Sequence, residues 1–382
     1  MKKKVALHNL GCKVNAYEVE AMQQLLENEG YETVPFEEGA DVYVINTCTV
    51  TNIADRKSRQ MLHKAKKMNP DAIVVATGCY AQADTEKLKE DTAVDLILGN
   101  NQKTQIVEAL EEYEKEHAKQ VQVIEINHTK EYEELSISST AEHVRAYIKV
   151  QDGCNQFCTY CIIPFARGRV RSRKIEEVLS EVETLAAKGY KEVVLTGIHL
   201  SSYGVDFPKE ERESLLSLIQ AVSRVEGISR IRLGSLEPRI ITEEFLEGIV
   251  KTGKVCPHFH LSLQSGCNKT LKNMNRRYSA QEYAEKCELI RKFYPVPALT
   301  TDVIVGFPQE TEEDFEESYE FVKKIHFYET HIFKYSRRHG TKAASMDGQL
   351  TEAAKAQRSD RMLELHEIRA REYEEAMIGK KM

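Results

Sequence analysis

Three cysteines lie close together near the middle of the chain. Cys154, Cys158 and Cys161 are separated by three and then by two residues, directly after a predicted strand. A loop this compact can wrap three thiolates around one cubic [4Fe-4S] cluster. Because the protein supplies only three ligands, the fourth iron keeps an open position, by the same logic that separates a catalytic zinc site from a closed structural one. An open iron can chelate a small molecule.

A zinc site or a set of structural thiols is the alternative explanation for this loop. Structural zinc sites usually combine two Cys pairs or Cys/His pairs, and the sequence around the loop offers no fourth ligand. We therefore favour an iron–sulfur cluster over zinc.

The cysteine spacing, with the aromatic residue Tyr160 just before the third cysteine, resembles the signature of the radical S-adenosylmethionine (SAM) superfamily. The resemblance implies that the open iron binds the amino and carboxylate groups of SAM and donates an electron to its sulfonium, which releases a 5'-deoxyadenosyl radical. It also implies SAM contacts at the carboxyl ends of further strands, where barrel active sites form. The residues expected to bind SAM are Tyr160, Gly197, Ser235, Glu237 and Gly306.

Three other cysteines each follow a predicted strand near the N-terminus, namely Cys12, Cys48 and Cys79. In a parallel sheet these strand ends share one edge, so the three thiols are expected to converge there. Buried structural cysteines are the alternative, since free Cys is among the most buried residue types. The neighbouring Gly11 and Gly78 suit loops that wrap closely around an inorganic group, which favours a second three-cysteine cluster. The remaining cysteines, Cys256, Cys267 and Cys287, share no spacing and are expected to be structural.

The segments that must position the N-terminal cysteines alternate between β-branched runs and amphipathic helical patterns. This alternation predicts a parallel sheet with crossover helices. The expected strands cover residues 5–10, 42–46, 73–77 and 94–98, and the expected helices cover residues 17–29 and 54–68 and a segment ending near 113. The polar stretch 114–142 is expected to be a connector, with a domain boundary near residue 140.

After the connector the same alternation continues through six more strands. They are expected at residues 146–150, 192–196, 230–234, 258–263, 300–305 and 331–335. Six such units predict an open, partial version of the eight-unit barrel. The predicted fold class is α/β, with a Rossmann-like parallel domain (1–115), a connector (116–140), an open (β/α)6 partial TIM barrel (141–350) and one long C-terminal helix (351–382).

Composition restricts the protein class. The 382 residues are 41% hydrophobic and 30% charged, with neither the apolar core of a signal peptide nor a long apolar run. We therefore expect a cytoplasmic protein without membrane contact. An odd number of cysteines in a large intracellular chain argues against a disulfide framework and for metal binding or catalysis. The net charge of -7 does not decide RNA binding, which depends on local Lys/Arg clusters.

Two three-cysteine sites, one in an N-terminal αβ domain and one in a radical SAM barrel, resemble the layout of the methylthiotransferases. These enzymes replace a C–H bond by C–S–CH3. The bacterial MtaB branch, which acts on N6-threonylcarbamoyladenosine (t6A) at position 37 of tRNA, is the most similar. The segments that carry this likeness are 10–15 (LGCKVN), 46–51 (NTCTVT), 57–60 (KSRQ), 153–164 (GCNQFCTYCIIP), 166–168 (ARG) and 195–199 (LTGIH).

The resemblance implies a mechanism and a set of partners. The radical removes the hydrogen from C2 of the adenine, sulfur associated with the Cys12/Cys48/Cys79 cluster attacks the carbon radical, and a second SAM supplies the methyl group. The expected partners are the anticodon stem-loop of tRNA, an electron donor such as flavodoxin or ferredoxin, and a sulfur donor. The family also carries a small C-terminal β-barrel, the TRAM domain, after about residue 380. We expect that truncation explains its absence here.

A run of five cations in eight residues follows the SAM-cluster loop, at residues 167–174. Placed at the barrel mouth, these cations would neutralise tRNA phosphates, and a single-stranded anticodon loop can splay its bases into a pocket. The predicted tRNA contacts are Arg167, Arg169, Arg171, Arg173, Arg337 and Arg338, with Arg276, Arg277, Lys334 and His339 nearby.

The sequence leaves two alternatives to a t6A methylthiotransferase. The first keeps the chemistry but changes the substrate to isopentenyladenosine-37 of tRNA or to an aspartate of a ribosomal protein. The second is a non-catalytic iron–sulfur or zinc protein, against which the open coordination site argues.

Overall fold

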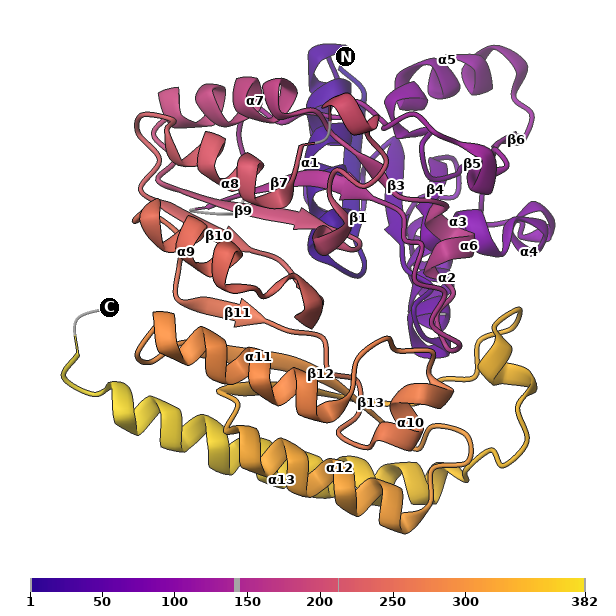
Figure 1. Cartoon of the computed structure of the whole chain (residues 1–382). Helices are drawn as coiled ribbons and strands as arrows, with labels where there is room; N and C mark the ends of the chain where they lie inside the picture. Colours follow the sequence, from indigo (N-terminus) through magenta and orange to yellow (C-terminus); the bar gives the residue numbers. More distant parts are fainter. Residues whose placement is uncertain (1, 141–144, 212, 381–382) are drawn as a thin grey trace.

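A computed structural model describes residues 2–140, 145–211 and 213–380. The first domain is built on a parallel sheet with the strand order β2-β1-β3-β4-β5-β6 (Figure 1). Its strands are β1 (Lys4–Asn9), β2 (Glu32–Thr33), β3 (Val42–Thr47), β4 (Ile73–Gly78), β5 (Leu96–Leu98) and β6 (Gln120–Gln122). Its helices are α1 (Lys13–Asn28), α2 (Asn52–Met68), α3 (Cys79–Ala83), α4 (Thr85–Glu90) and α5 (Ile106–Glu116).

The central strands of this sheet are buried on both faces. Every residue of β3 is buried, as expected for a parallel strand that helices cover on both sides. Strands β1, β3 and β4 are direct neighbours, and Asn9, Asn46 and Thr77 lie in register near their carboxyl ends. The three segments that carry Cys12, Cys48 and Cys79 therefore leave the sheet side by side.

The second domain contains two sheet segments, with the orders β10-β9-β7-β8 and β11-β12-β13. Parallel bridges between Ile231 and Val255 and between Leu236 and Leu261 join them into one curved, open barrel. Its strands are β7 (Ala146–Asp152), β8 (Arg171–Ser172), β9 (Glu192–Gly197), β10 (Arg230–Leu233), β11 (His258–His260), β12 (Ala298–Val305) and β13 (Glu329–Lys334). Only β8 in this part of the described chain runs antiparallel to its neighbour, β7.

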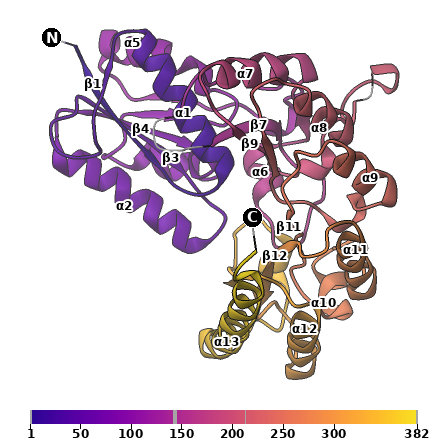
Figure 2. The ribbon, with the colours of Figure 1, turned by 90° about the vertical axis from the view of Figure 1, so that its left-hand side faces the viewer.

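Most helices of this domain follow one another along the outside of the barrel strands, while the short α6 (Ile163–Arg167) lies against α3 of the first domain (Figure 1). The other helices are α7 (Ile175–Ala187), α8 (Leu215–Ser223), α9 (Glu243–Lys251), α10 (Asn268–Asn273), α11 (Ala280–Phe293), α12 (Glu312–Ile325) and α13 (Glu352–Met377). Local sequence fixes several starts: α11 begins with a capping box formed by Ser279 and Glu282, and α12 begins with one formed by Thr311 and Asp314. Helix α13 lies beside α12, at the opposite end of the barrel from α7 (Figure 2).

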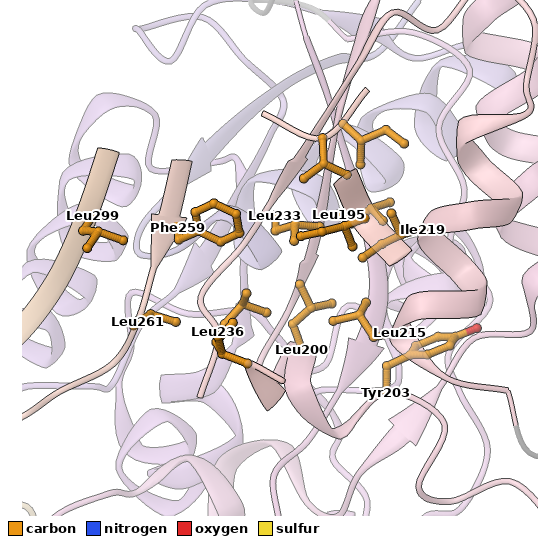
Figure 3. Packing of buried hydrophobic residues seen from close by; sticks show 14 of the residues in the cluster. Leu195, Leu200, Tyr203, Leu215, Ile219, Leu233, Leu236, Phe259, Leu261 and Leu299 are labelled. Atoms are coloured by element: carbon orange, nitrogen blue, oxygen red, sulfur yellow. The ribbon is translucent and has the colours of Figure 1, made fainter. Parts of the chain in front are cut away.

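The barrel core is an apolar cluster between the strands and the helices. Leu195, Leu233, Phe259 and Leu299 come from four successive strands, and Ile219 of α8 packs beside them (Figure 3). Helix α13 adds two buried side chains, Met362 and Leu365, to the same cluster. The expected packing of a long C-terminal helix on the barrel is therefore confirmed.

The expected fold class is confirmed, and most elements lie where the sequence indicated. The connector differs from the expectation. Strand β6 lies beyond residue 115 and pairs with β5, so the first sheet extends one strand beyond β5. This strand was not predicted because its sequence, Gln-Val-Gln, is mostly polar. Farther along, Leu135 and Ile137 are buried in the barrel core. The expected boundary near residue 140 adjoins residues 141–144, which lie outside the described residues. Among the described helices, none is both long and apolar enough to cross a membrane.

Candidate active site between two cysteine clusters

A cavity of about 800 Å³ opens between the two domains and receives residues from both. Cys12 of the first domain lines it together with Cys154, Cys158 and Cys161 of the barrel. Four of the five residues predicted to bind SAM line it too: Tyr160, Gly197, Ser235 and Glu237. Its volume is within the range of ligand pockets, which typically measure about 300–1,000 Å³. The cavity can hold a cofactor beside a substrate group.

Gly306, the fifth predicted SAM residue, does not line this cavity. Its backbone N–H donates to Oε2 of Glu310 at 2.7 Å, and the space where a side chain would start is filled by Lys355 of α13. In this structure Gly306 makes the tight turn after β12 rather than a cavity wall.

Neighbouring loops hold the Cys154–Cys161 loop in shape. Gly153 has φ +70°, and a Cβ there would lie 1.8 Å from the carbonyl oxygen of Arg169, so only glycine fits. The next residue, Cys154, donates its backbone N–H to Gly168 at 3.0 Å. On the other side, the backbone N–H of Thr159 donates to Met274 at 3.1 Å. The three thiols therefore project from a loop anchored at both ends.

Arg276 connects this loop to the cavity wall. Its Nη1 donates to Sγ of Cys158 at 3.4 Å, and its Nε donates to the hydroxyl of Tyr278 at 2.9 Å. A fixed guanidinium beside a ligating sulfur stabilises negative charge on that sulfur and on the cluster it holds. The sequence predicted that Arg276 would lie near RNA phosphates. In the structure the guanidinium of Arg276 instead contacts Cys158 of the SAM-cluster loop.

The first-domain cysteines occupy the ends of three neighbouring strands. Cys12 is the N-cap residue of α1, Cys48 follows β3, and Cys79 is the first residue of α3. Gly11 has φ +112°, and a Cβ at this position would lie 3.2 Å from Sγ of Cys48, so the absence of a side chain lets the two loops approach. The sequence predicted this convergence from the strand order.

Neither cysteine trio has the geometry of a single zinc site. Two thiolates on one zinc ion lie at most about 4.6 Å apart, because each Zn–S bond measures about 2.3 Å. Among the described residues, neither trio has all its sulfurs within 4.8 Å of one another. All nine cysteines of the described chain are free thiols. This spread of the sulfurs argues against one zinc ion bound by either trio.

Burial disfavours the thiolate form of two of these cysteines, Cys48 and Cys154. It raises the pKa of Cys48 to about 12 and that of Cys154 to about 11. The thiolate is the form that ligates iron, so cluster assembly displaces protons from these cysteines.

A buried ionic network lies directly behind the first-domain cysteines. Arg167 donates from Nη1 to Glu18 at 2.8 Å and to Asp152 at 3.1 Å, while its Nε donates to Sγ of Cys79 at 3.1 Å. Lys149 also pairs with Glu18, at 2.9 Å. Burial alone would raise the pKa of Glu18, but Arg167, Lys103 and Lys149 lower it well below its usual value. The network fastens α1 and the Cys79 loop to β7 of the barrel.

Comparison with known proteins agrees with this geometry. Residues 4–99 match the uncharacterized protein family UPF0004, and residues 148–322 match the radical SAM superfamily. The threonylcarbamoyladenosine tRNA methylthiotransferase MtaB of Bacillus subtilis is 45% identical over 97% of this chain and 81% of its own length. The MtaB of Aquifex aeolicus is 46% identical over 99% of this chain and 92% of its own length. The chain belongs to the MtaB family of radical SAM methylthiotransferases. Its cofactors are therefore SAM and [4Fe-4S] clusters.

This MtaB family member is also similar to an enzyme of another name and to a solved radical SAM structure. A tRNA-2-methylthio-N(6)-dimethylallyladenosine synthase of Thermoanaerobacter pseudethanolicus is 37% identical over 94% of this chain and 77% of its own length. Among solved structures, the radical SAM methyltransferase TsrM of Kitasatospora setae has a TM-score of 0.62 at 16% identity, covering 90% of this chain and 74% of that one. The TsrM likeness supports the fold alone.

The expectation of RNA contact is wrong for four of the six arginines. Arg167 and Arg171 are fully buried, and Arg173 and Arg338 are nearly so. They are buried and each pairs with groups inside the protein, so they cannot reach phosphates. Arg169 and Arg337 are exposed and remain candidates.

Each buried arginine has a structural partner. Arg171 donates to the backbone carbonyls of Arg167 and Arg169, at 3.0 Å each. Arg173 pairs with Glu181 of α7. Arg338, in the loop after β13, donates to Asp55 of α2 at 2.6 Å and so joins the two domains.

Sequence reasoning missed the partner of Arg167, which is Glu18 of α1. A fully buried glutamate in an amphipathic helix lies on the apolar face, and that position was the available signal. The sequence analysis also did not predict that His260, Asp302 and His331, on β11, β12 and β13, line the cavity. Their residue types alone gave no indication of this.

Proposed function

We propose that this chain methylthiolates C2 of N6-threonylcarbamoyladenosine at position 37 of tRNA, producing 2-methylthio-t6A. One observation carries the proposal: cysteines of both trios, Cys12 and Cys154/Cys158/Cys161, line the same cavity. A sulfur held by the first trio and a radical generated at the second could then act on one substrate atom. The names of the two MtaB relatives supply the substrate class.

Each group of residues has a distinct role in this proposal. Cys154, Cys158 and Cys161 would hold the [4Fe-4S] cluster that binds SAM and would supply radical chemistry at C2. Cys12, Cys48 and Cys79 would hold a second cluster that would supply sulfur, and a second SAM would supply the methyl group. Tyr160, Gly197, Ser235 and Glu237 form the wall that holds SAM, and Arg276 fixes the charge beside Cys158. The domain interface shields the reacting atoms from bulk water.

Two exposed arginines are the proposed contacts to RNA. Arg169 lies 4.5 Å over the ring of Phe157, which in turn packs at 6.0 Å against the exposed Phe165. An arginine and aromatic rings beside the SAM-cluster loop could stack an unpaired base of the anticodon loop. Arg337 offers a phosphate contact on the loop after β13. The proposal also includes an electron donor such as flavodoxin or ferredoxin, a sulfur donor, and action in the cytoplasm.

Mass spectrometry of tRNA tests the proposed function. The anaerobically reconstituted protein is incubated with SAM, a reductant and tRNA that carries t6A, and the nucleosides are then analysed. We expect 2-methylthio-t6A with the wild type and none with Cys154→Ala. The Cys12→Ala variant should still cleave SAM to 5'-deoxyadenosine yet form no methylthio product. A parallel reaction contains tRNA that carries isopentenyladenosine, and a methylthio product in that reaction alone would reassign the substrate. SAM cleavage without a nucleoside product in either reaction would exclude tRNA methylthiolation.

A further inference from the structure

A set of polar side chains lines the cavity on the strands opposite the clusters. His260, Asp302 and His331 lie on the adjacent strands β11, β12 and β13, and all three line the cavity. Asp302 is the register partner of His331, and one nitrogen or oxygen atom from each of the three side chains lies within 4.8 Å of the other two. We call these three residues the polar wall.

Internal hydrogen bonds fix part of the polar wall. Nδ1 of His260 lies 2.9 Å from Oγ1 of Thr300, and its Nε2 lies 3.2 Å from Oδ2 of Asp302. The ring of His331 stacks on that of His260, with centroids 5.7 Å apart and planes at 23°. These contacts hold the imidazole ring of His260 in one orientation beside Asp302 and His331.

The other two side chains keep capacity for a ligand. The side chain of Asp302 is 27% exposed and that of His331 is 44% exposed. Lysines from two different elements, Lys13 at the start of α1 and Lys334 at the end of β13, line the same cavity. The wall therefore offers a carboxylate, an imidazole and cations within one chamber, which suits a ligand with both donors and an anionic group.

A metal ion is the competing occupant of these residues, since two histidines and a carboxylate are a known ligand set. Nδ1 of His260 already has Thr300 as a partner, but its Nε2 lies 3.2 Å from Oδ2 of Asp302, a separation that two ligands of one ion also have. The positive charges of Lys13 and Lys334, which line the same cavity, disfavour a bound cation and favour an organic ligand.

We propose that the polar wall recognises the threonylcarbamoyl group on N6 of the target adenosine, an inference that rests on the proposed function. That substituent carries N–H donors, a hydroxyl group and a carboxylate. The donors suit the carboxylate of Asp302, and the carboxylate suits His331 and the two lysines. An isopentenyl group has none of these and, where it displaces water from the cavity, would leave polar groups of the wall unpaired. Sites built on hydrogen bonds reject analogues that lack the partner far more strongly than apolar pockets reject an added group.

RNA binding tests this assignment independently of catalysis. The holoprotein is titrated with two anticodon stem-loops, one with t6A and one with unmodified adenosine at position 37, and the ratio of the two dissociation constants is measured. We expect the wild type to prefer t6A. His331→Phe and Asp302→Asn should each reduce the preference by about tenfold, as expected for the loss of one hydrogen bond to a charged group. Affinity for SAM should be unchanged.

His63→Phe is the matched control, because His63 also pairs with an aspartate, Asp91 at 2.8 Å, but lies outside the cavity. It should keep the wild-type ratio. The inference is overturned if the wild type binds both stem-loops equally, if both wall variants keep the wild-type ratio, or if His331→Phe weakens SAM binding or removes a bound divalent metal ion. A preference for t6A without any methylthio product would instead contradict the proposed function and leave the polar wall as a t6A-binding site.

Discussion

Nε of Arg167 lies 3.1 Å from Sγ of Cys79, although the two residues belong to different domains. The same guanidinium is paired with Glu18 and Asp152 and is fully buried. A single side chain thus joins a proposed cluster ligand of the first domain to the barrel. This contact helps to hold the Cys79 loop of the first domain against the barrel.

Replacing Arg167 tests how much the domain interface depends on it. Arg167→Met should lower the free energy of unfolding by about 3–5 kcal/mol, because it removes one of the cations that pair with the buried carboxylates of Glu18 and Asp152. Denaturant unfolding measures the change. Arg169→Met, two residues away and exposed, should change stability by no more than about 0.5 kcal/mol. Equal effects of the two substitutions would show that the buried pairs contribute little.

Arg276 should tune the cluster held by the SAM-cluster loop. Arg276→Ala removes a cation and a hydrogen bond from Sγ of Cys158, so the reduced, more negative cluster loses stabilisation. We expect a lower reduction potential in an electron paramagnetic resonance titration. The neighbouring Arg277→Ala, at an exposed position, is the control and should leave the potential unchanged. An unchanged potential in Arg276→Ala would contradict a role for this hydrogen bond.

His258 should make stability depend on pH. Burial, and then the cations Arg232 and Lys13, lower its pKa to about 4 from an unfolded value of 6.5. The folded chain therefore binds fewer protons than the unfolded chain between these values. The contribution of neutral His258 is fully present above pH 6.5 and is lost as the pH falls toward about 4.

The measurement is denaturant unfolding of wild type and His258→Gln across this pH range. The variant should lose less stability on acidification than the wild type, while His63→Gln, which is exposed, should follow the wild type. Parallel curves for all three proteins would show that His258 is not held neutral.

The sequence predicted the cysteine positions well because strand order and spacing determine them. Cys12, Cys48 and Cys79 follow β1, β3 and β4, and a parallel sheet must bring those strand ends to one edge. The sequence did not predict that most of the arginines expected to contact RNA are buried. The run from Arg167 to Lys174 looks like a solvated cationic face, but Arg167 pairs with Glu18, 149 residues earlier, and Arg173 pairs with Glu181 of α7, eight residues later. A partner as distant as Glu18 leaves no local pattern.

RNA affinity should depend on Arg169, the exposed arginine of that run. Arg169→Ala should weaken tRNA binding and reduce the slope of log affinity against log salt by about one, the contribution of one phosphate contact. Arg361→Ala is the control, because Arg361 lies on α13 and pairs with Glu316. Fluorescence anisotropy at several salt concentrations measures both. If Arg169→Ala binds tRNA as the wild type does, RNA contacts another surface.

The most direct test of two clusters around one cavity is the iron and labile sulfide content of anaerobically reconstituted protein. We predict about eight irons in the wild type and about four in each of two triple variants, Cys154→Ala/Cys158→Ala/Cys161→Ala and Cys12→Ala/Cys48→Ala/Cys79→Ala. Bound zinc, or about four irons in the wild type that only one triple variant removes, would contradict the account.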